Sequence, residues 1–232
     1  MSIRKLREKA RRLLTERPDM GRCDLAKELE TTDYKARKLL AELKNEPIGP
    51  KIAYFDIETT GFKPDIHRII CAIILSYPSM TYHVFRQDKI DKKRDFTDDA
   101  ELCRQIRDCL EDHHIIVGWW SKGFDVPFIN TRLVQNGDKK LRNHLHIDPY
   151  YYHKGWHGVK PGRASLEAVG DFYGVSERKY KVDKETWTQV SIGDPNAMEI
   201  IVDRCKSDVL LLAQVTQQVF EADLVKNITR YA

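Results

Sequence analysis

The feature that most constrains this fold is a nearly continuous apolar run at residues 67–77, HRIICAIILSY. A strand of this composition is buried on both faces, which is typical of the centre of a sheet. Pro78, Ser79 and Met80 then supply a turn. The run therefore favours an α/β domain with this strand inside the sheet.

Other predicted elements follow this central strand in a regular order. Residues 51–58, 82–85 and 114–119 have the composition of strands. Residues 98–112 show helical spacing of apolar side chains, and the charged section 87–95 is expected to be an exposed loop. Three strands in succession, followed by helix, strand and helix, predict a mixed sheet flanked by helices.

The charge and the prolines divide the chain of 232 residues into unequal parts. Residues 1–46 carry 13 lysines and arginines against 9 acids, whereas the rest carries 26 of each, so the formal net charge of +4 lies in the first part. The stretch 45–50, NEPIGP, is a natural boundary. We expect a basic module at 1–46, a linker at 47–50 and a larger domain at 51–232. A basic module suggests nucleic acid as a partner.

The basic module has the pattern of three short helices, at residues 3–15, at 23–29 and after a capping turn at 31–33. Their apolar positions are Leu6, Ala10, Leu13 and Leu14, then Leu25, Ala26 and Leu29, then Ala36, Leu39, Leu40 and Leu43. A tight turn before the last helix resembles a helix-turn-helix. In that case the third helix presents Tyr34, Lys35, Arg37 and Lys38 to a nucleic-acid groove. The alternative is a small helical bundle for protein contact.

The sequence also indicates where the protein works. No run of 18 apolar residues is present, so no membrane-spanning segment is expected. The basic N-terminus lacks the apolar segment of a secretory signal. Five cysteines are scattered without a C-x-x-C pair, which favours reduced thiols over disulfides or a zinc site. We therefore expect a cytoplasmic protein in a reducing compartment.

Two carboxylates stand near the end of the first strand, in KIAYFDIETTGF. Asp56 and Glu58 are two residues apart, so their side chains share one face. Two neighbouring carboxylates repel each other unless a cation lies between them, and their oxygens suit Mg²⁺ or Mn²⁺. The alternative is a solvated strand end with two unrelated acids.

Two further acids stand at distinctive positions. Asp125 follows the strand at 114–119 and begins a helix, where it can also be a simple N-cap. Asp208 lies in the last helix, in a stripe that otherwise contains Ile201, Cys205, Leu212, Val215 and Val219. An acid in a buried stripe is costly without a compensating charge. That charge is either a metal ion or Arg204, one turn earlier.

If the four acids converge, they can hold two divalent ions that activate water and stabilise a leaving phosphodiester oxygen. The segments that contain these acids resemble the motifs of a known family. The segments FDIETTG, GFDVPFINTRL and RCKSDVLLL resemble the three motifs of the DEDD (DnaQ-like) 3′–5′ exonucleases. The segments HIDPYYYH and ASLEAVGDFYGV resemble the stretch that precedes the third motif. The likeness is greatest to the exonuclease domains of family B polymerases and their free-standing relatives.

The resemblance implies a ribonuclease H-like fold with a five-stranded mixed sheet. It implies that Asp56, Glu58, Asp125 and Asp208 are catalytic metal ligands for two Mg²⁺ or Mn²⁺ ions. It further implies a nucleic-acid substrate, DNA before RNA, and a possible replication or repair partner.

This chain departs from the family pattern in two motifs. The family places a water-orienting Tyr four residues before the last Asp, or a His five before it, where this chain has Arg204 and Asp203. An arginine stays protonated and can hold a phosphate instead. Tyr180 or Lys206 is a candidate for the water-orienting role. Trp120 replaces the usual Asn of the second motif and can stack on a base.

Aromatic and basic residues surround the acids in sequence and are candidates for nucleic-acid contact. The candidates are Phe62, Trp119, Trp120, Lys122, Phe124 and Arg204. The segment 150–163, YYYHKGWHGVKPGR, is expected to be a loop that contacts single strands or simply covers the core. His153 and His157 lie there without further ligands, so no zinc pair is expected.

Three functions remain open at this stage. The leading hypothesis is a metal-dependent 3′–5′ exonuclease that acts on single-stranded ends and is targeted by the N-terminal module. The first alternative is a catalytically weak or inactive nucleic-acid-binding adaptor, favoured by Arg204. The second is a structure-specific endonuclease of ribonuclease H type.

Overall fold

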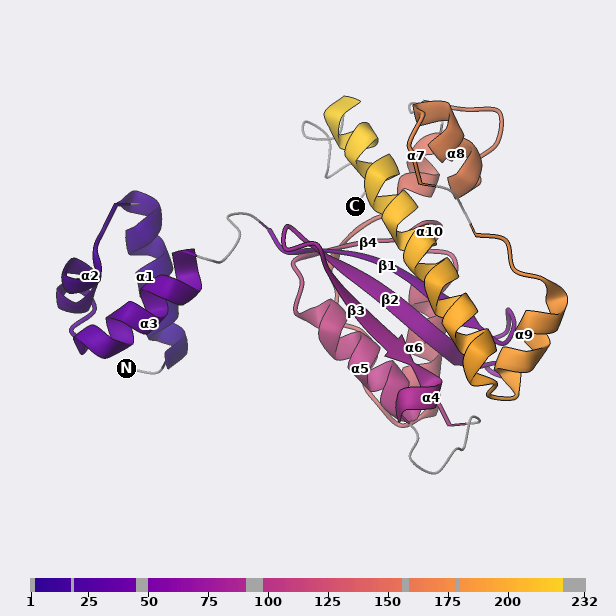
Figure 1. Ribbon diagram of the computed structural model, residues 1–232, viewed down its shortest axis with the longest axis horizontal. Coiled ribbons are helices and arrows are strands. Elements are labelled where there is room, and N and C mark those ends of the chain that lie inside the picture. Colours follow the sequence, from indigo (N-terminus) through magenta and orange to yellow (C-terminus); the bar gives the residue numbers. More distant parts are fainter. Residues whose placement is uncertain are drawn as a thin grey trace. The chain divides into compact units, whose positions relative to one another are not determined.

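The computed structural model describes residues 3–17, 19–44, 50–90, 98–155, 159–177 and 180–222. The chain forms two compact units, Met1–Gly49 and Pro50–Ala232, which are described separately (Figure 1). Among the described segments, no helix is both long enough and apolar enough to cross a membrane.

The first unit is a bundle of three helices, α1 (Ile3–Glu16), α2 (Arg22–Glu28) and α3 (Asp33–Lys44). Its buried core consists of Met20 and six of the predicted apolar residues: Ala10, Leu25, Leu29, Ala36, Leu39 and Leu43. The other five predicted residues are partly buried and pack against this core: Leu6, Leu13, Leu14, Ala26 and Leu40. The Thr32 hydroxyl accepts a hydrogen bond from the Lys35 amide and so caps α3. Tyr34, Lys35, Arg37 and Lys38 are all exposed, as predicted. The helix-turn-helix assignment stays a prediction.

The second unit is built on the expected mixed sheet of five strands. These are β1 (Ile52–Thr59), β2 (Ile69–Tyr77), β3 (Thr81–Arg86), β4 (Ile115–Val117) and β5 (Leu145–Ile147). Their order across the sheet is β3-β2-β1-β4-β5. β1, β2 and β3 are antiparallel neighbours, whereas β4 and β5 run parallel to β1. The apolar run thus lies inside the sheet, where β2 is buried over its first seven residues.

Helices cover both faces of the sheet (Figure 1). The long helix α10 (Pro195–Ala222) crosses one face together with α8 (Leu166–Tyr173) and α9 (Lys184–Ser191). On the other face lie α5 (Ala100–Glu111) and α6 (Asp125–Gln135). Alternate residues of β1, β2 and β4 therefore enter two separate apolar cores. The expected α/β architecture with flanking helices is confirmed.

Two segments expected as loops contain helix. In the section 87–95, residues Gln87–Ile90 form the short helix α4, and residues 91–95 lie outside the described residues. In the segment 150–163, residues up to Lys154 belong to α7 (Pro149–Lys154). The Asp148 carboxylate accepts a hydrogen bond from the Tyr150 amide and Pro149 occupies the first turn, so α7 has a complete start despite its aromatic composition.

A buried ion pair connects the helices α5 and α6 to the start of β2. Asp99, which is fully buried, accepts hydrogen bonds from the Arg132 guanidinium, with the shortest at 2.7 Å. The same carboxylate accepts from the Ile69 amide at 2.9 Å and from Asn136 at 3.2 Å. Each carboxylate lone pair thus meets a donor, which is the condition under which a buried charge is tolerated.

Candidate functional site

The strand β1 sends its two acids to the face that α10 covers. Ile52 and Tyr54 lie in the core beneath α10, and Asp56 and Glu58 continue the same alternation towards the end of the strand. Phe55 and Ile57 enter the opposite core. The strict two-residue period of a strand is why both carboxylates face one helix.

Asp125 reaches the same end of β1 through the edge of the sheet. β4 pairs with Ile52–Tyr54, and no described strand pairs with the later residues of β1 on that side. Asp125, the first residue of α6, is buried, and its Oδ1 accepts a hydrogen bond from the Ile57 amide at 3.2 Å. The carboxylate thus lies beside the backbone that joins Asp56 to Glu58. The N-cap position of α6 is occupied by Phe124, so Asp125 is not the N-cap that its sequence position also allowed. Its carboxylate instead fills the open strand edge.

Asp208 approaches from α10, together with Arg204. Asp208 is buried, as its place in the apolar stripe predicts. The Arg204 Nε donates to Glu58 Oε1 at 2.9 Å, and its Nη2 lies 3.6 Å from Asp208 Oδ2. The ion pair with Arg204, one of the two alternatives for Asp208, is therefore present. The same guanidinium also binds Glu58 and so brings the strand and the helix acids together.

The group closest to a metal-binding geometry consists of Asp56, Glu58 and Cys205. In the described part of the chain, their ligand atoms lie within 4.8 Å of one another. The Cys205 thiol is 3.4 Å from Asp56 Oδ2 and donates to it. Burial raises the pKa of Cys205 well above its ordinary value. The two carboxylates supply oxygen ligands of the kind that a hard cation such as Mg²⁺ or Mn²⁺ takes.

The electrostatics of the site also favour a cation. Burial, together with the nearby charges of Asp148 and Glu58, raises the pKa of Asp125 to about 7, against the hydrogen bond from the Ile57 amide. For Arg204, burial acts to lower the pKa, but Glu58, Asp208 and Asp56 raise it above its ordinary value. Negative charge is thus concentrated at this end of β1, where a divalent cation would be stabilised.

The sequence did not identify Asp148 as a site residue. Its carboxylate holds the loop that contains Trp120 and Lys122 and precedes Asp125. It is buried, and its carboxylate accepts hydrogen bonds from the amides of Trp120 at 2.8 Å and Lys122 at 2.9 Å. Burial raises the pKa of Asp148, and these amides oppose the shift. The dipeptide Asp148-Pro149 is a helix-start pattern that also begins α10, where Asp194 precedes Pro195 and accepts a hydrogen bond from the Ala197 amide, and this pattern could have revealed Asp148.

Aromatic rings form a cluster next to the acids. The Trp120 and Phe124 rings stack, with centroids 6.1 Å apart and planes at 8°, and the edge of Phe62 meets Phe124 at 6.1 Å. Phe62 is 85% exposed and Trp120 46% exposed. Trp120 adopts φ 55°, and a Cβ on Gly123 would lie 2.5 Å from its indole, so glycine is required there. Two rings are thus held in place while much of their surface faces solvent.

The remaining residues that the sequence suggested for nucleic-acid contact or a zinc pair are partly or fully buried where they are described. Trp119 is partly buried and stacks on His153, with ring centroids 5.8 Å apart. His153 is buried against the carbonyl of Val159, and His157 lies outside the described residues. Lys122 is partly buried in the loop that Asp148 holds, and burial lowers its pKa.

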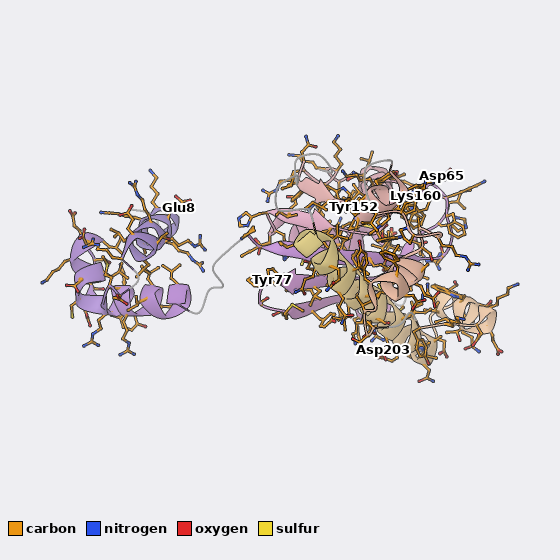
Figure 2. All side chains as sticks on the ribbon, turned by 90° about the horizontal axis from the view of Figure 1, so that it is seen from above. Glu8, Asp65, Tyr77, Tyr152, Lys160 and Asp203 are labelled. Carbon is orange, nitrogen blue, oxygen red and sulfur yellow. The ribbon has the colours of Figure 1, made fainter. Side chains whose placement is uncertain are left out.

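The two candidates for the water-orienting role are Tyr180 and Lys206, and the described contacts of their side chains do not involve the four acids. Tyr180 offers its backbone carbonyl to Arg204 at 3.0 Å, while its side chain is exposed. Lys206 pairs with Asp203 at 3.1 Å, and Asp203 lies on the outer surface of α10 (Figure 2). The residue in contact with the acids is instead Arg204, which was expected to hold a phosphate.

Comparisons with known proteins agree with this architecture. Residues 53–220 match the sequence model of the RNase H superfamily. The chain belongs to this superfamily, whose members are generally nucleases.

A solved structure with a similar fold is the family B DNA polymerase from the hyperthermophilic archaeon Pyrobaculum calidifontis, with a TM-score of 0.52 and 19% identity. The match covers 75% of this chain but 25% of the polymerase chain, so the likeness concerns the fold of one part of that enzyme. The expected ribonuclease H-like fold is confirmed. No curated protein matches the sequence.

Proposed function

We propose that this protein is a divalent-metal-dependent 3′–5′ exonuclease that hydrolyses phosphodiester bonds at nucleic-acid ends. The proposal is supported by the contacts at one end of β1, where Asp125 accepts from the Ile57 amide between Asp56 and Glu58, and Arg204 links Glu58 with Asp208. Membership of a superfamily of nucleases supports it.

Each residue has a role in this proposal. Asp56 and Glu58 hold the metal, with Asp125 and Asp208 completing the acidic set. The bound ion would activate a water molecule and stabilise the leaving oxygen. Asp125, fixed to the β1 backbone, keeps the strand end rigid, and Arg204 holds Glu58 in place. The cations proposed to bind a phosphate are Arg204, which contacts Glu58, and Lys122, in the loop before Asp125.

The aromatic cluster supports a single-stranded end as the substrate. Phe62, Trp120 and Phe124 lie beside the acids and offer solvent-facing rings, on which unpaired bases stack irrespective of sequence. A duplex interior has no free base faces to offer. A frayed or unpaired terminus is therefore the substrate that fits this surface.

The direct test is incubation of the full chain with end-labelled single- and double-stranded DNA and RNA in Mg²⁺ or Mn²⁺. A 3′–5′ exonuclease releases nucleoside monophosphates and leaves a ladder of 5′-labelled products that shortens with time. Products cut at one internal position would instead support the endonuclease alternative. Binding without cleavage in either metal would support the adaptor, for which the contact between Arg204 and Glu58 is the specific observation.

Removing the exposed ring of Phe62 tests the aromatic surface. We expect Phe62→Ala to weaken binding of single-stranded DNA by ~1–3 kcal/mol, or about 5- to 150-fold, because one stacking contact is lost. Phe172→Ala is the matched control, since Phe172 is an exposed aromatic residue on α8. Fluorescence anisotropy with a labelled oligonucleotide measures both. Equal affinities of the two variants would contradict the role of Phe62.

We further propose that the N-terminal unit is a helix-turn-helix that binds duplex DNA. Its third helix exposes Lys35, Arg37 and Lys38 beside Tyr34, which is the arrangement that a groove-binding helix requires. Such a unit would deliver the nuclease to DNA rather than RNA, in replication or repair. An intracellular, reducing location is part of the proposal, and the five free cysteines support it.

The salt dependence of binding tests this module. The triple variant Lys35→Gln, Arg37→Gln and Lys38→Gln is expected to reduce the slope of log K against log salt by ~0.9 for each lost phosphate contact. A variant with Lys9, Arg11 and Arg12 changed to glutamine removes the same charge from exposed positions of α1 and is the control. If both variants change the slope equally, the effect is general charge and the third helix has no special role.

A further inference from the structure

Arg204 is held more firmly than a surface arginine. Its guanidinium donates to Glu58 at 2.9 Å and to the Tyr180 carbonyl at 3.0 Å, and lies 3.6 Å from Asp208. Its Cζ lies 5.6 Å from the centre of the Trp187 ring, and the side chain is 18% exposed. Contacts from β1, α9, α10 and the segment before α9 thus fix this cation inside the acidic site.

The position of this charge limits what else the site can hold. One oxygen of Glu58 is engaged by Arg204, on the side of the site towards Asp208. Asp56 and Glu58 also lie close together with the Cys205 thiol. A guanidinium remains protonated at any pH at which the protein is folded, so its charge is permanent. A divalent ion placed between Glu58 and Asp208 would be repelled by it and would have to displace it.

We infer that Arg204 replaces one of the two cations of a two-metal centre, so that this chain binds a single divalent ion, held by Asp56 and Glu58. The inference rests on the proposed nuclease centre, since it concerns the same acids. In this arrangement Arg204 compensates Asp208 and one oxygen of Glu58 permanently, and the metal compensates the remaining charge. Arg204 is thereby a specificity-determining residue that sets the number of ions.

Metal binding by the full chain without nucleic acid tests the inference. The number of bound Mn²⁺ ions is measured by electron paramagnetic resonance and by titration calorimetry. We expect one ion for the wild-type protein and two for Arg204→Met, which keeps the length of the side chain but removes the charge. Arg204→Lys keeps a cation on the same helical turn and is expected to stay at one ion.

Arg107→Met is the matched control. Arg107 also bridges two carboxylates, those of Asp108 at 2.8 Å and Asp138 at 3.4 Å, and its side chain is 16% exposed. It lies on α5, on the face of the sheet opposite α10. This variant is expected to bind one ion like the wild-type protein. A second measurement is thermal unfolding: Mn²⁺ should raise the melting temperature of Arg204→Met more than that of the wild-type protein.

Two ions on the wild-type protein, or none, would overturn the inference, whether or not Arg204→Met folds. An unchanged count in a folded Arg204→Met protein would overturn it as well. The proposed nuclease activity is decided separately by the cleavage of labelled substrates. A protein that binds one ion but cleaves nothing would retain the single-ion centre and lose the proposed function.

Discussion

Replacing Asp56 by asparagine is expected to reduce nucleotide release at least about a hundredfold, with the fold retained. The variant removes one charged oxygen from the proposed metal site, and the charge stabilisation that a catalytic metal supplies amounts to several kcal/mol. Asparagine keeps the shape of the side chain, and its carbonyl oxygen can still accept from the Cys205 thiol. The rate is measured on 5′-labelled single-stranded DNA in Mn²⁺, and the fold by circular dichroism.

The control for this variant is Asp65→Asn. Asp65 is an exposed acid in the segment between β1 and β2 and lies at the surface of the domain (Figure 2). The same change in net charge there is expected to leave the rate within about twofold, as surface substitutions away from the site have small effects. Undiminished cleavage by a folded Asp56→Asn protein, with contaminating nucleases excluded, would rule out the proposed centre.

Replacing Arg132 by methionine is expected to lower the free energy of unfolding by about 3–5 kcal/mol. The change leaves the fully buried carboxylate of Asp99 without its guanidinium partner, and an uncompensated buried charge is strongly destabilising. The remaining donors, the Ile69 amide and Asn136, carry no full charge. Urea denaturation followed by circular dichroism measures the loss.

Arg104→Met is the control that distinguishes the cost of an uncompensated buried charge from the loss of an ordinary ion pair. Arg104 pairs with Glu101 at 3.0 Å and Asp138 at 2.9 Å, at partly exposed positions of the same unit. Exposed pairs contribute ~0–1 kcal/mol, so a small loss is expected. Adding Asp99→Asn to Arg132→Met should recover stability, because no buried charge then remains. A loss below about 1 kcal/mol in Arg132→Met would show that Asp99 finds water or another cation.

Much of the site could be predicted because its signals are local. The two-residue period of a strand places Asp56 and Glu58 on one face without knowledge of any other element. The apolar stripe of the last helix identifies Asp208 as buried, because its neighbours in the stripe must face the core. Both conclusions agree with the structure.

Two segments show where local patterns mislead. The aromatic, glycine-bearing stretch at 150–163 has a loop-like composition, yet capping by Asp148 and the fixed backbone of Pro149 start a helix there. Gln87–Ile90 forms a single helical turn whose Gln87 is buried. In each case hydrogen bonds and burial supplied by the surrounding fold outweigh the weak intrinsic preference of a short segment.

The sequence by itself determined the mixed sheet, its flanking helices, the division into two units and the common face of Asp56 and Glu58, since each follows from periodicity and composition. The tertiary structure decided which groups contact the acids that lie far apart in the sequence. β4 stops after three residues and leaves a strand edge that Asp125 fills, and Arg204 reaches across from α10 to Glu58. Such contacts join residues separated by 68 and 146 positions, and they depend on strand length and helix placement that no local pattern encodes.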